Sequence, residues 1–179
     1  GNGIPGFSGD GGLAINATIT ESHDLAFDLD GNLYFTDYYN HRIRMIDTFG
    51  IITTFAGNGS FGASGDSGIC TNAAIGYPEG IAIDSIGNLF VTQGNTACVR
   101  KIDTNGIITT IAGVANTITY NGNEIPATSA HLNFPADVAI DTLGNIYISE
   151  YFGGRIRKID TGGVIHTIAG TGVLGYNGD

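Results

Sequence analysis

One segment of the chain occurs three times. It begins at Leu25, Ile81 and Val138, so the repeat has a period of 56 and then 57 residues. A period of this length is typical of proteins built from tandem structural units. The repeat constrains the fold more than any other feature, because repeated positions must first satisfy the needs of the unit itself.

The two ends of the sequence also match each other. Residues 1–10 read GNGIPGFSGD and residues 170–179 read GTGVLGYNGD. We therefore expect three repeats, at residues 1–56, 57–112 and 113–169, with the start of a fourth at residues 170–179. On this interpretation the chain is a segment of a longer tandem array.

Each copy contains four short apolar runs that are separated by turn residues. None of them has the length or the period of a helix, and β-branched residues are frequent in them. A Gly-Asn pair between the first and second runs supplies the positive φ of a tight hairpin. We predict first strands at residues 24–28, 80–84 and 137–141, second strands at 33–37, 89–93 and 146–150, third strands at 42–47, 98–103 and 155–160, and fourth strands at 51–56, 107–112 and 164–169.

Four antiparallel strands followed by a long link to the next unit predict an all-β protein made of β-propeller blades. Three stretches, PEGIAID at residues 78–84, GNLFVT at 87–92 and YNHRIR at 39–44, resemble the NHL repeat. The resemblance implies a propeller, typically six-bladed, with the first strand of each blade lining the channel and the fourth at the outer edge. Since three blades do not close such a ring, further repeats, a second segment or an open array are the alternatives.

The charge of the chain limits its partners. The formal net charge is −10, which argues against nucleic acid or an anionic membrane as a partner. No apolar run approaches the roughly 20 residues of a membrane span. All seven Lys and Arg residues lie in the third strands. We expect them to pair with the repeated Asp47, Asp103 and Asp160 or with carboxylates of the next blade, and a functional cationic stripe is the alternative.

Cysteines and glycosylation sequons bear on the location of the protein. Cys70 and Cys98 both depart from the repeat pattern, so they are candidates for a disulfide, with two free thiols as the alternative. Asn16 and Asn58 begin Asn-x-Ser/Thr sequons, which are used only in secreted proteins. We therefore expect an extracellular or cell-surface location, with any signal outside this segment.

Residues just before the first strands are the candidates for a ligand site, because they converge at one end of a propeller channel. These positions hold His23, Asp24, Glu79 and Asp137, and they vary from copy to copy. Histidine and carboxylate ligands suit a divalent cation such as calcium, so a metal site is a hypothesis here. Solvated turn residues are the alternative, and no other cofactor is expected.

Aromatic residues after the second strand are candidates for a contact face. Tyr38 and Tyr39 in the first repeat correspond to Tyr151 and Phe152 in the third. Paired aromatic side chains on a rigid face suit contacts with proteins or glycans. Packing between blades is the competing interpretation.

The function predicted from the sequence is that of a non-enzymatic, extracellular scaffold, an interaction or adhesion module. It would bind protein partners or assemble with further repeats, for example in a surface structure or filament. The resemblance also implies an alternative, a small-ligand binder or a lyase or esterase-like hydrolase with a divalent metal at the channel mouth. Catalysis has little support, because the four histidines occupy four different positions of the repeat.

Overall fold

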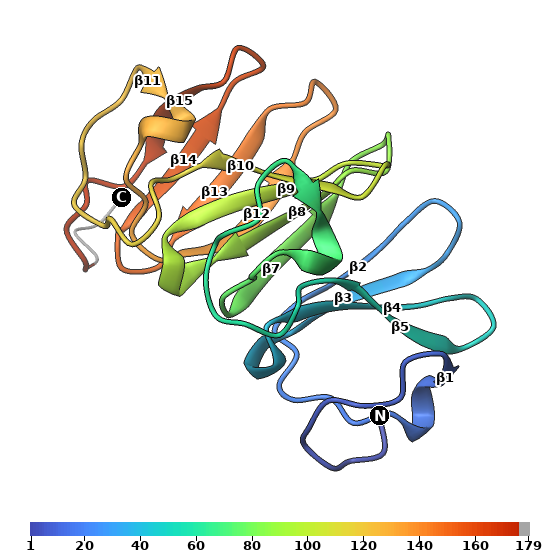
Figure 1. Ribbon diagram of the computed structural model, residues 1–179. Coiled ribbons are helices and arrows are strands. Elements are labelled where there is room, and N and C mark those ends of the chain that lie inside the picture. Colours follow the sequence, from blue (N-terminus) through green and yellow to red (C-terminus); the bar gives the residue numbers. More distant parts are fainter. Residues whose placement is uncertain (176–179) are drawn as a thin grey trace.

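Each repeat folds into one antiparallel sheet of five strands, here called a blade, and the three blades lie in a row (Figure 1). The computed structural model describes residues 1–175. Blade 1 consists of β1 (Gly12–Leu13), β2 (Leu25–Phe27), β3 (Leu33–Asp37), β4 (Arg42–Ile46) and β5 (Ile51–Ala56). Blade 2 consists of β6 (Gly68–Ile69), β7 (Pro78–Ile83), β8 (Leu89–Gln93), β9 (Cys98–Ile102) and β10 (Ile107–Ala112). Blade 3 consists of β11 (Ile125–Pro126), β12 (Pro135–Ile140), β13 (Ile146–Glu150), β14 (Arg155–Ile159) and β15 (Val164–Ala169).

The all-β, blade-by-blade architecture predicted from the repeat is confirmed. The second and fourth strands have the predicted bounds, while the third strands stop one residue early, because the aspartate that follows each of them belongs to a turn. The first strands differ more. β7 and β12 begin two residues before the predicted position, and β2 is shorter than predicted.

A fifth strand that the sequence did not predict lies at the outer edge of every blade. It has two residues and comes from the loop before the blade, as Gly12 and Leu13 pair with Ile52 and Ile51. The order in blade 1 is β1-β5-β4-β3-β2, and the other blades repeat it. The fourth strand of the repeat is therefore not the outermost one, which corrects the arrangement that the NHL resemblance implied.

Aspartates fix the hairpin between the first two long strands of each blade. The Oδ1 atom of Asp28 accepts hydrogen bonds from the backbone N–H groups of Asp30 and Asn32, and Asn32 Nδ2 donates to Oδ2 at 2.8 Å. Asp84 and Asp141 do the same in the next blades. The turn glycine has φ values of +86°, +98° and +86° in the three copies, as the Gly-Asn signal predicted.

The apolar core lies between the blades. Ile43 and Ala56 of blade 1 pack in one cluster with Ile75, Ile81 and Leu89 of blade 2. Their equivalents Val99 and Ala112 of blade 2 pack in the same way against blade 3. Each blade therefore offers one face to the blade before it and the other face to the blade after it.

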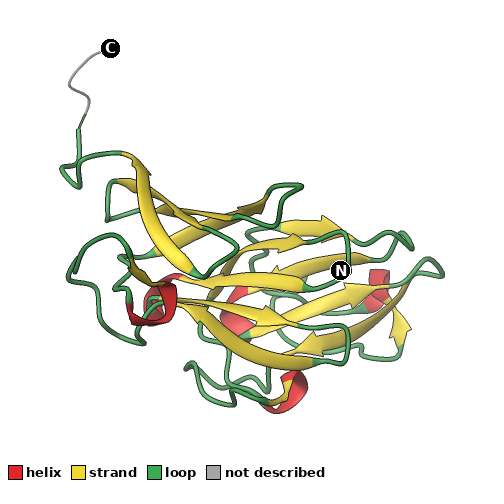
Figure 2. Cartoon of the chain, turned by 90° about the horizontal axis from the view of Figure 1, so that it is seen from above, coloured by secondary structure: helices red, strands yellow, loops and turns green. Residues whose placement is uncertain are grey.

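Helical structure is limited to single 3-10 turns in the described part of the chain (Figure 2). They are η1 (Ala14–Asn16), η2 (Tyr38–Asn40), η3 (Cys70–Asn72), η4 (Gly94–Thr96) and η5 (Ala127–Ser129). Within residues 1–175, no helix has the length and apolar composition needed to cross a membrane.

Candidate functional site at the channel mouth

The segments at the start of the inner strands, residues 21–24, 77–80 and 134–137, form what we call the mouth. Each begins with a residue in the left-handed region, with φ of +52° at Glu21, +46° at Tyr77 and +56° at Phe134. This conformation is uncommon for residues other than glycine. Its recurrence at three equivalent positions shows that every repeat turns into its inner strand in the same way.

His23 and Glu79 meet across the junction of blades 1 and 2. The Nδ1 atom of His23 lies 2.5 Å from Glu79 Oε2, and Nε2 lies 3.1 Å from Glu21 Oε1. Burial lowers the pKa of His23, but hydrogen bonds and the charges of the two glutamates outweigh burial, so the pKa is raised. The site is thus an acid-flanked imidazole that favours its protonated form.

Asp24 and Asp137 are engaged with the backbone. Asp24 accepts hydrogen bonds at 2.8 Å from its own neighbour Leu25 and from Ile81 of blade 2. Asp137 accepts one from Val138 at 2.8 Å. In residues 1–175 no three His, Cys, Asp or Glu side chains come together as a metal site would need. The structure thus pairs His23 with Glu79 but does not gather the four candidate residues into one ligand set.

An aromatic cluster covers the mouth beside His23. Its members are His23, Tyr38, Tyr39, His41, Phe61 and Tyr77. The Tyr38 ring is stacked on His23, with centroids 4.1 Å apart and planes at 16°, and it contacts the Tyr77 ring at 4.8 Å. Burial and the charge of Glu79 raise the pKa of Tyr38 to about 12. The Tyr38 ring thus packs against the rings of His23 and Tyr77, whereas Tyr39 is 53% exposed.

Blade 3 carries a second aromatic group at the equivalent place. Phe134 contacts Phe152 and Tyr151, with ring centroids 5.2 and 6.0 Å apart. Tyr151 and Phe152 are exposed, at 66% and 54%. Blade 2 has Gly94 at this position, where the Phe134 ring leaves no room for a side chain. The aromatic residues of blade 3 thus pack against one another, and Tyr151 and Phe152 still present exposed rings.

The arginines of the third strands hold the preceding loops in place. Arg44 is fully buried and pairs with Asp10 at 2.8 Å and Asp37 at 3.2 Å. Arg100 pairs with Asp66 at 2.6 Å, and Arg157 lies 3.6 Å from Glu150. The predicted structural role is right but the predicted partners are wrong.

Asp47, Asp103 and Asp160 accept backbone N–H groups in the turn between the third and fourth strands instead. This turn lies at the far end of the third strand from the loop carboxylates. The sequence could not distinguish the two ends, because both carry acidic residues in at least two of the three repeats.

The two cysteines are free and buried. Cys70 donates its backbone N–H to Gly106, in the turn after β9, whereas Cys98 begins β9. At about 3.3 Å per residue, the length of the strand separates them by more than the roughly 7 Å that a disulfide spans. The structure therefore has the two thiols rather than the predicted disulfide.

The two sequons differ in their contacts. Asn58 Nδ2 donates to the carbonyl of Asn72 at 3.0 Å, in the way that Asn2 donates to Asn16. Asn16 is exposed in η1, and no hydrogen bond engages its side-chain amide among the described residues. The sequon at Asn16 is thus the more accessible one.

Of the remaining histidines, His41 belongs to the aromatic cluster beside His23, whereas His131 and His166 lie outside it. His41 Nδ1 accepts the N–H of Tyr77 at 3.2 Å. His131 is 2.7 Å from the carbonyl of Thr119, and His166 contacts Glu124 at 2.7 Å. Sequence reasoning had placed these histidines in different parts of the repeat, and the structure keeps them there.

Comparison with known proteins places the chain among NHL propellers. The family model described as Teneurin NHL domain matches residues 60–121. Teneurin-3 of Mus musculus is 30% identical over 175 residues, which is 90% of this chain and 6% of that protein. Protein SUPPRESSOR OF QUENCHING 1, chloroplastic, of Arabidopsis thaliana is 39% identical over 77 residues, covering 42% of this chain and 7% of that protein. The chain thus spans only a small part of these relatives.

A solved structure shares the arrangement of the blades. A structural genomics protein of unknown function from Bacteroides thetaiotaomicron superposes with a TM-score of 0.67 at 27% identity, over 75% of this chain and 34% of that one. The repeated sheets, the sequence relatives and this superposition agree. The chain belongs to the NHL-repeat β-propeller family.

Proposed function

We propose that the chain is a non-enzymatic protein-interaction module whose two open blade faces bind further blades. The observation that carries this proposal is that positions buried between blades are exposed at both ends of the row. The further blades would come from the same array or from a second copy of the chain.

Blade 3 exposes the face that blades 1 and 2 bury. Ile43 and Val99 are fully buried, whereas their equivalent Ile156 is 37% exposed. Ile156 and Ala169 border a shallow cavity of about 330 Å³, and Ile168, on the same strand as Ala169, is also exposed. Apolar side chains of this kind gain free energy when another surface covers them.

Blade 1 exposes the opposite face. Leu25 is 58% exposed, whereas its equivalents Ile81 and Val138 are 4% and 5% exposed. The two open faces are thus the two halves of the junction that the chain already contains twice. Head-to-tail contact would rebuild that junction, and such heterologous contacts form rings or open filaments.

Exposed aromatic rings give the module a second contact surface, for protein partners or glycans. Tyr39, Tyr151 and Phe152 lie on the mouth side of the blades and are more than half exposed. Large amphipathic rings supply much of the binding energy in many interfaces. The acidic side chains nearby are engaged, as Asp24 binds two backbone amides and Glu79 binds His23, which supports binding rather than catalysis.

Sedimentation of the chain across its soluble concentration range tests the assembly. We expect self-association in the wild type and monomers for Ile156→Asp and for Leu25→Asp. Because each variant keeps the face that the other lacks, an equimolar mixture of the two should form a heterodimer with a single junction. Phe49→Asp, at an exposed turn outside both faces, is the matched control and should associate like the wild type.

Two outcomes would reject the proposal. One is a wild-type chain that is a folded monomer at every concentration. The other is association that survives in both variants and is lost in Phe49→Asp, which would place the contact at the turn.

The proposal includes an extracellular location. Expression through a secretory pathway should give one N-glycan, at Asn16, that is lost in Asn16→Gln and retained in Asn58→Gln, as followed by mass spectrometry. A chain that is never glycosylated in this setting would argue against an extracellular location. Glycosylation of Asn58 would contradict the expectation that Asn16 is the more accessible sequon.

A further inference from the structure

The end of the blades away from the mouth carries two cavities. Well 1 lies between blades 1 and 2 and has a volume of about 450 Å³, and well 2 lies between blades 2 and 3 with about 410 Å³. Well 1 is bordered by the β2–β3 and β7–β8 hairpins and by the turn between β9 and β10, and well 2 by the β7–β8 and β12–β13 hairpins. They are thus repeated features of the blade junction, on the side opposite to the aromatic rings.

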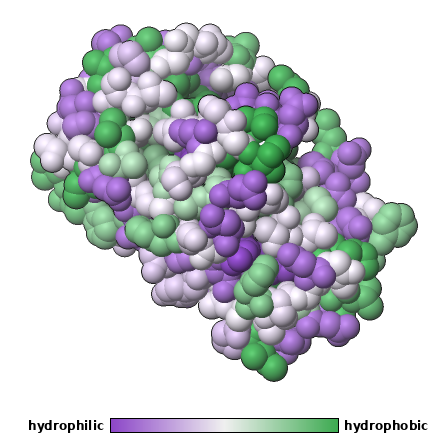
Figure 3. Space-filling view, viewed as in Figure 1, coloured by the Kyte–Doolittle hydropathy of each residue, from purple (hydrophilic) through white to green (hydrophobic). Residues whose placement is uncertain are grey.

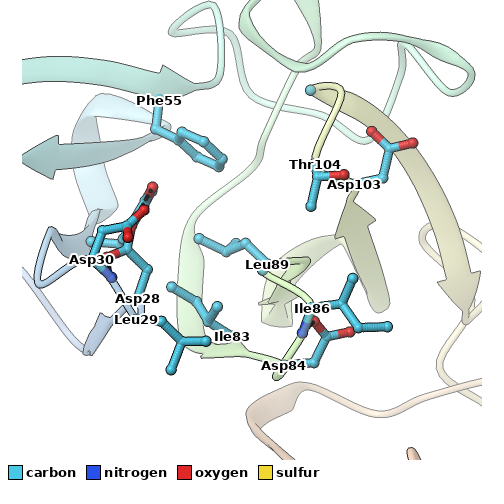
Figure 4. A pocket seen from close by; sticks show the side chains of 13 residues that line it. Asp28, Leu29, Asp30, Phe55, Ile83, Asp84, Ile86, Leu89, Asp103 and Thr104 are labelled. Carbon is cyan, nitrogen blue, oxygen red and sulfur yellow. Dashed lines mark hydrogen bonds between the residues drawn. The ribbon is translucent and has the colours of Figure 1, made fainter.

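Aliphatic side chains form the floor and the rim of these wells. Figure 4 shows Leu29, Ile83 and Leu89 in the middle of well 1, between two groups of carboxylates. Each hairpin tip also carries a side chain that is almost fully in solvent, with Leu29 at 88%, Ile86 at 75% and Leu143 at 77% exposure. A turn favours Gly, Asn and Asp at such positions. On the face shown in Figure 3, hydrophobic residues are exposed among hydrophilic ones. These three residues, however, lie in the same hairpin of each blade.

The charge of the wells is entirely negative. Among the described residues that line them there is no Lys, Arg or His, and the acidic ones are Asp28, Asp30, Asp84, Asp103 and Asp141. Hydrogen bonds from Asn145 lower the pKa of Asp141 to about 2. Asp103 also has a lowered pKa, because the backbone N–H of Ile107 donates to it. These groups are therefore charged at neutral pH.

Two of the carboxylates in well 1 have oxygens left for a ligand. Asp28 and Asp84 use both oxygens inside their hairpins. Asp103 uses Oδ1 for Asn105 and Ile107, and within residues 1–175 no hydrogen bond engages its Oδ2 or the carboxylate of Asp30. Figure 4 shows Asp30 and Asp103 on opposite sides of the well.

The arginines of the chain do not neutralise this surface. Arg44, Arg100 and Arg157 are buried against the preceding loops, while Arg42 and Arg155 lie over the rings of Phe7 and Tyr120 at 3.7 and 3.9 Å. The cation beside the wells is Lys101, whose Nζ lies 5.8 Å from the Phe90 ring that lines well 2 and whose charge acts on Asp103. One lysine leaves most of the negative charge of the wells without a partner.

We propose that the two wells dock a basic, amphipathic segment of a partner protein. A Lys or Arg side chain has an apolar stem and a charged end. In well 1 the stem would lie on Leu29 and Ile86, with the charged end between Asp30 and Asp103. This surface is separate from the blade faces and the mouth, so it stands or falls independently of the assembly proposed above.

Three labelled peptides of equal length test the inference on the full chain. They alternate Leu with Lys, with Gln or with Glu, and fluorescence anisotropy measures their binding at low and high salt. We expect binding of the Lys peptide, weakened by salt, and none of the Glu peptide. The double variant Asp30→Asn/Asp103→Asn should weaken binding of the Lys peptide on the order of tenfold, since hydrogen bonds to charged groups contribute more than hydrogen bonds between neutral groups.

The matched control removes the same charge elsewhere. Glu21→Gln/Glu124→Gln alters two acidic residues outside both wells, so it should leave binding nearly unchanged. Leu29→Ser/Ile86→Ser should weaken the Lys peptide and the Gln peptide alike, because it removes the apolar part of the surface. Circular dichroism confirms that each variant is folded.

The inference is overturned by any of three results. The first is equal loss in the well variant and in the charge control, which would indicate attraction by net charge alone. The second is equal binding of the Lys and Glu peptides. The third is stoichiometric binding of calcium, added as calcium chloride, that displaces the Lys peptide and is lost in Asp30→Asn/Asp103→Asn. This result would make well 1 a cation site.

Discussion

At the mouth, charged side chains connect blades 1 and 2, whereas the backbones of blades 2 and 3 come into direct contact there. His23 contacts Glu79, and Asp24 binds the N–H of Ile81. At the second junction the equivalent positions are Glu79 with Ala136, and Gly80 lies directly against the backbone of Asp137. The apolar core of the two junctions is the same. The repeat thus fixes the packing, while the polar contacts vary from one junction to the next.

The largest expected effect breaks the second junction. In Gly80→Ala the new Cβ would lie 2.7 Å from the Cα atom of Asp137 and 2.8 Å from the carbonyl oxygen of Ala136. Because both neighbours are backbone atoms, the blades must shift, at a cost of about 1–3 kcal/mol. Urea denaturation measures the loss. Gly162→Ala is the control, because Gly162 is exposed and the equivalent positions of the other repeats hold Phe49 and Asn105. Equal losses in the two variants would contradict the close approach of blades 2 and 3.

The next effect is at the first junction. Asp24→Ala leaves the buried N–H of Ile81 without its acceptor, which we expect to destabilise the protein by about 1–3 kcal/mol. Asp137→Ala removes a bond only to its own neighbour, so its effect should be smaller. Amide exchange of Ile81 should accelerate in the first variant and not in the second. If both variants behave alike, Asp24 does not connect the blades.

A smaller effect depends on pH. Since the folded state raises the pKa of His23, its protonated form contributes stability that is complete below its unfolded pKa of about 6.5 and is lost as the pH rises through the folded value. The difference in melting temperature between the wild type and His23→Gln should shrink over this range. A difference that grows with pH would show that neutral His23 is the stabilising form.

The smallest expected effect concerns another side-chain contact across the first junction. Asn95 Nδ2 lies 3.5 Å from the hydroxyl oxygen of Tyr38 in an exposed position. Asn95→Ala should therefore change the free energy of unfolding by less than about 0.5 kcal/mol. A loss as large as that of Asp24→Ala would show that this long contact is a real part of the junction.

The sequence predicted the long strands because their apolar runs recur with fixed turn residues. It could not predict β1, β6 and β11, because a strand of two residues has no periodicity of its own. These strands depend on the loop folding back along β5, β10 and β15, where Gly12 finds Ile52 as its partner. Tertiary pairing, rather than local preference, creates them.

The mouth was predicted in part. Alignment of the repeats correctly brought His23 and Glu79 to one end of the blades, since both precede a first strand. His23 and Glu79 occupy equivalent positions of neighbouring repeats, so their pairing depends on how two blades pack, and the backbone bonds of Asp24 depend on where the next strand begins. Neither can be read from one repeat alone. The same is true of Arg44. The sequence does not show toward which end of the strand its guanidinium group extends, and this decides that Arg44 pairs with Asp37 rather than with Asp47.

The two-residue strands at the outer edges have a consequence for how such a chain can associate. A sheet edge with free N–H and C=O groups is a template for aggregation, and very short edge strands are one way in which proteins prevent it. In every blade the long fourth strand is covered by such a strand and the 3-10 turn that follows it. A sheet therefore cannot extend into another sheet at its outer edge. Contact between blades is left to their faces.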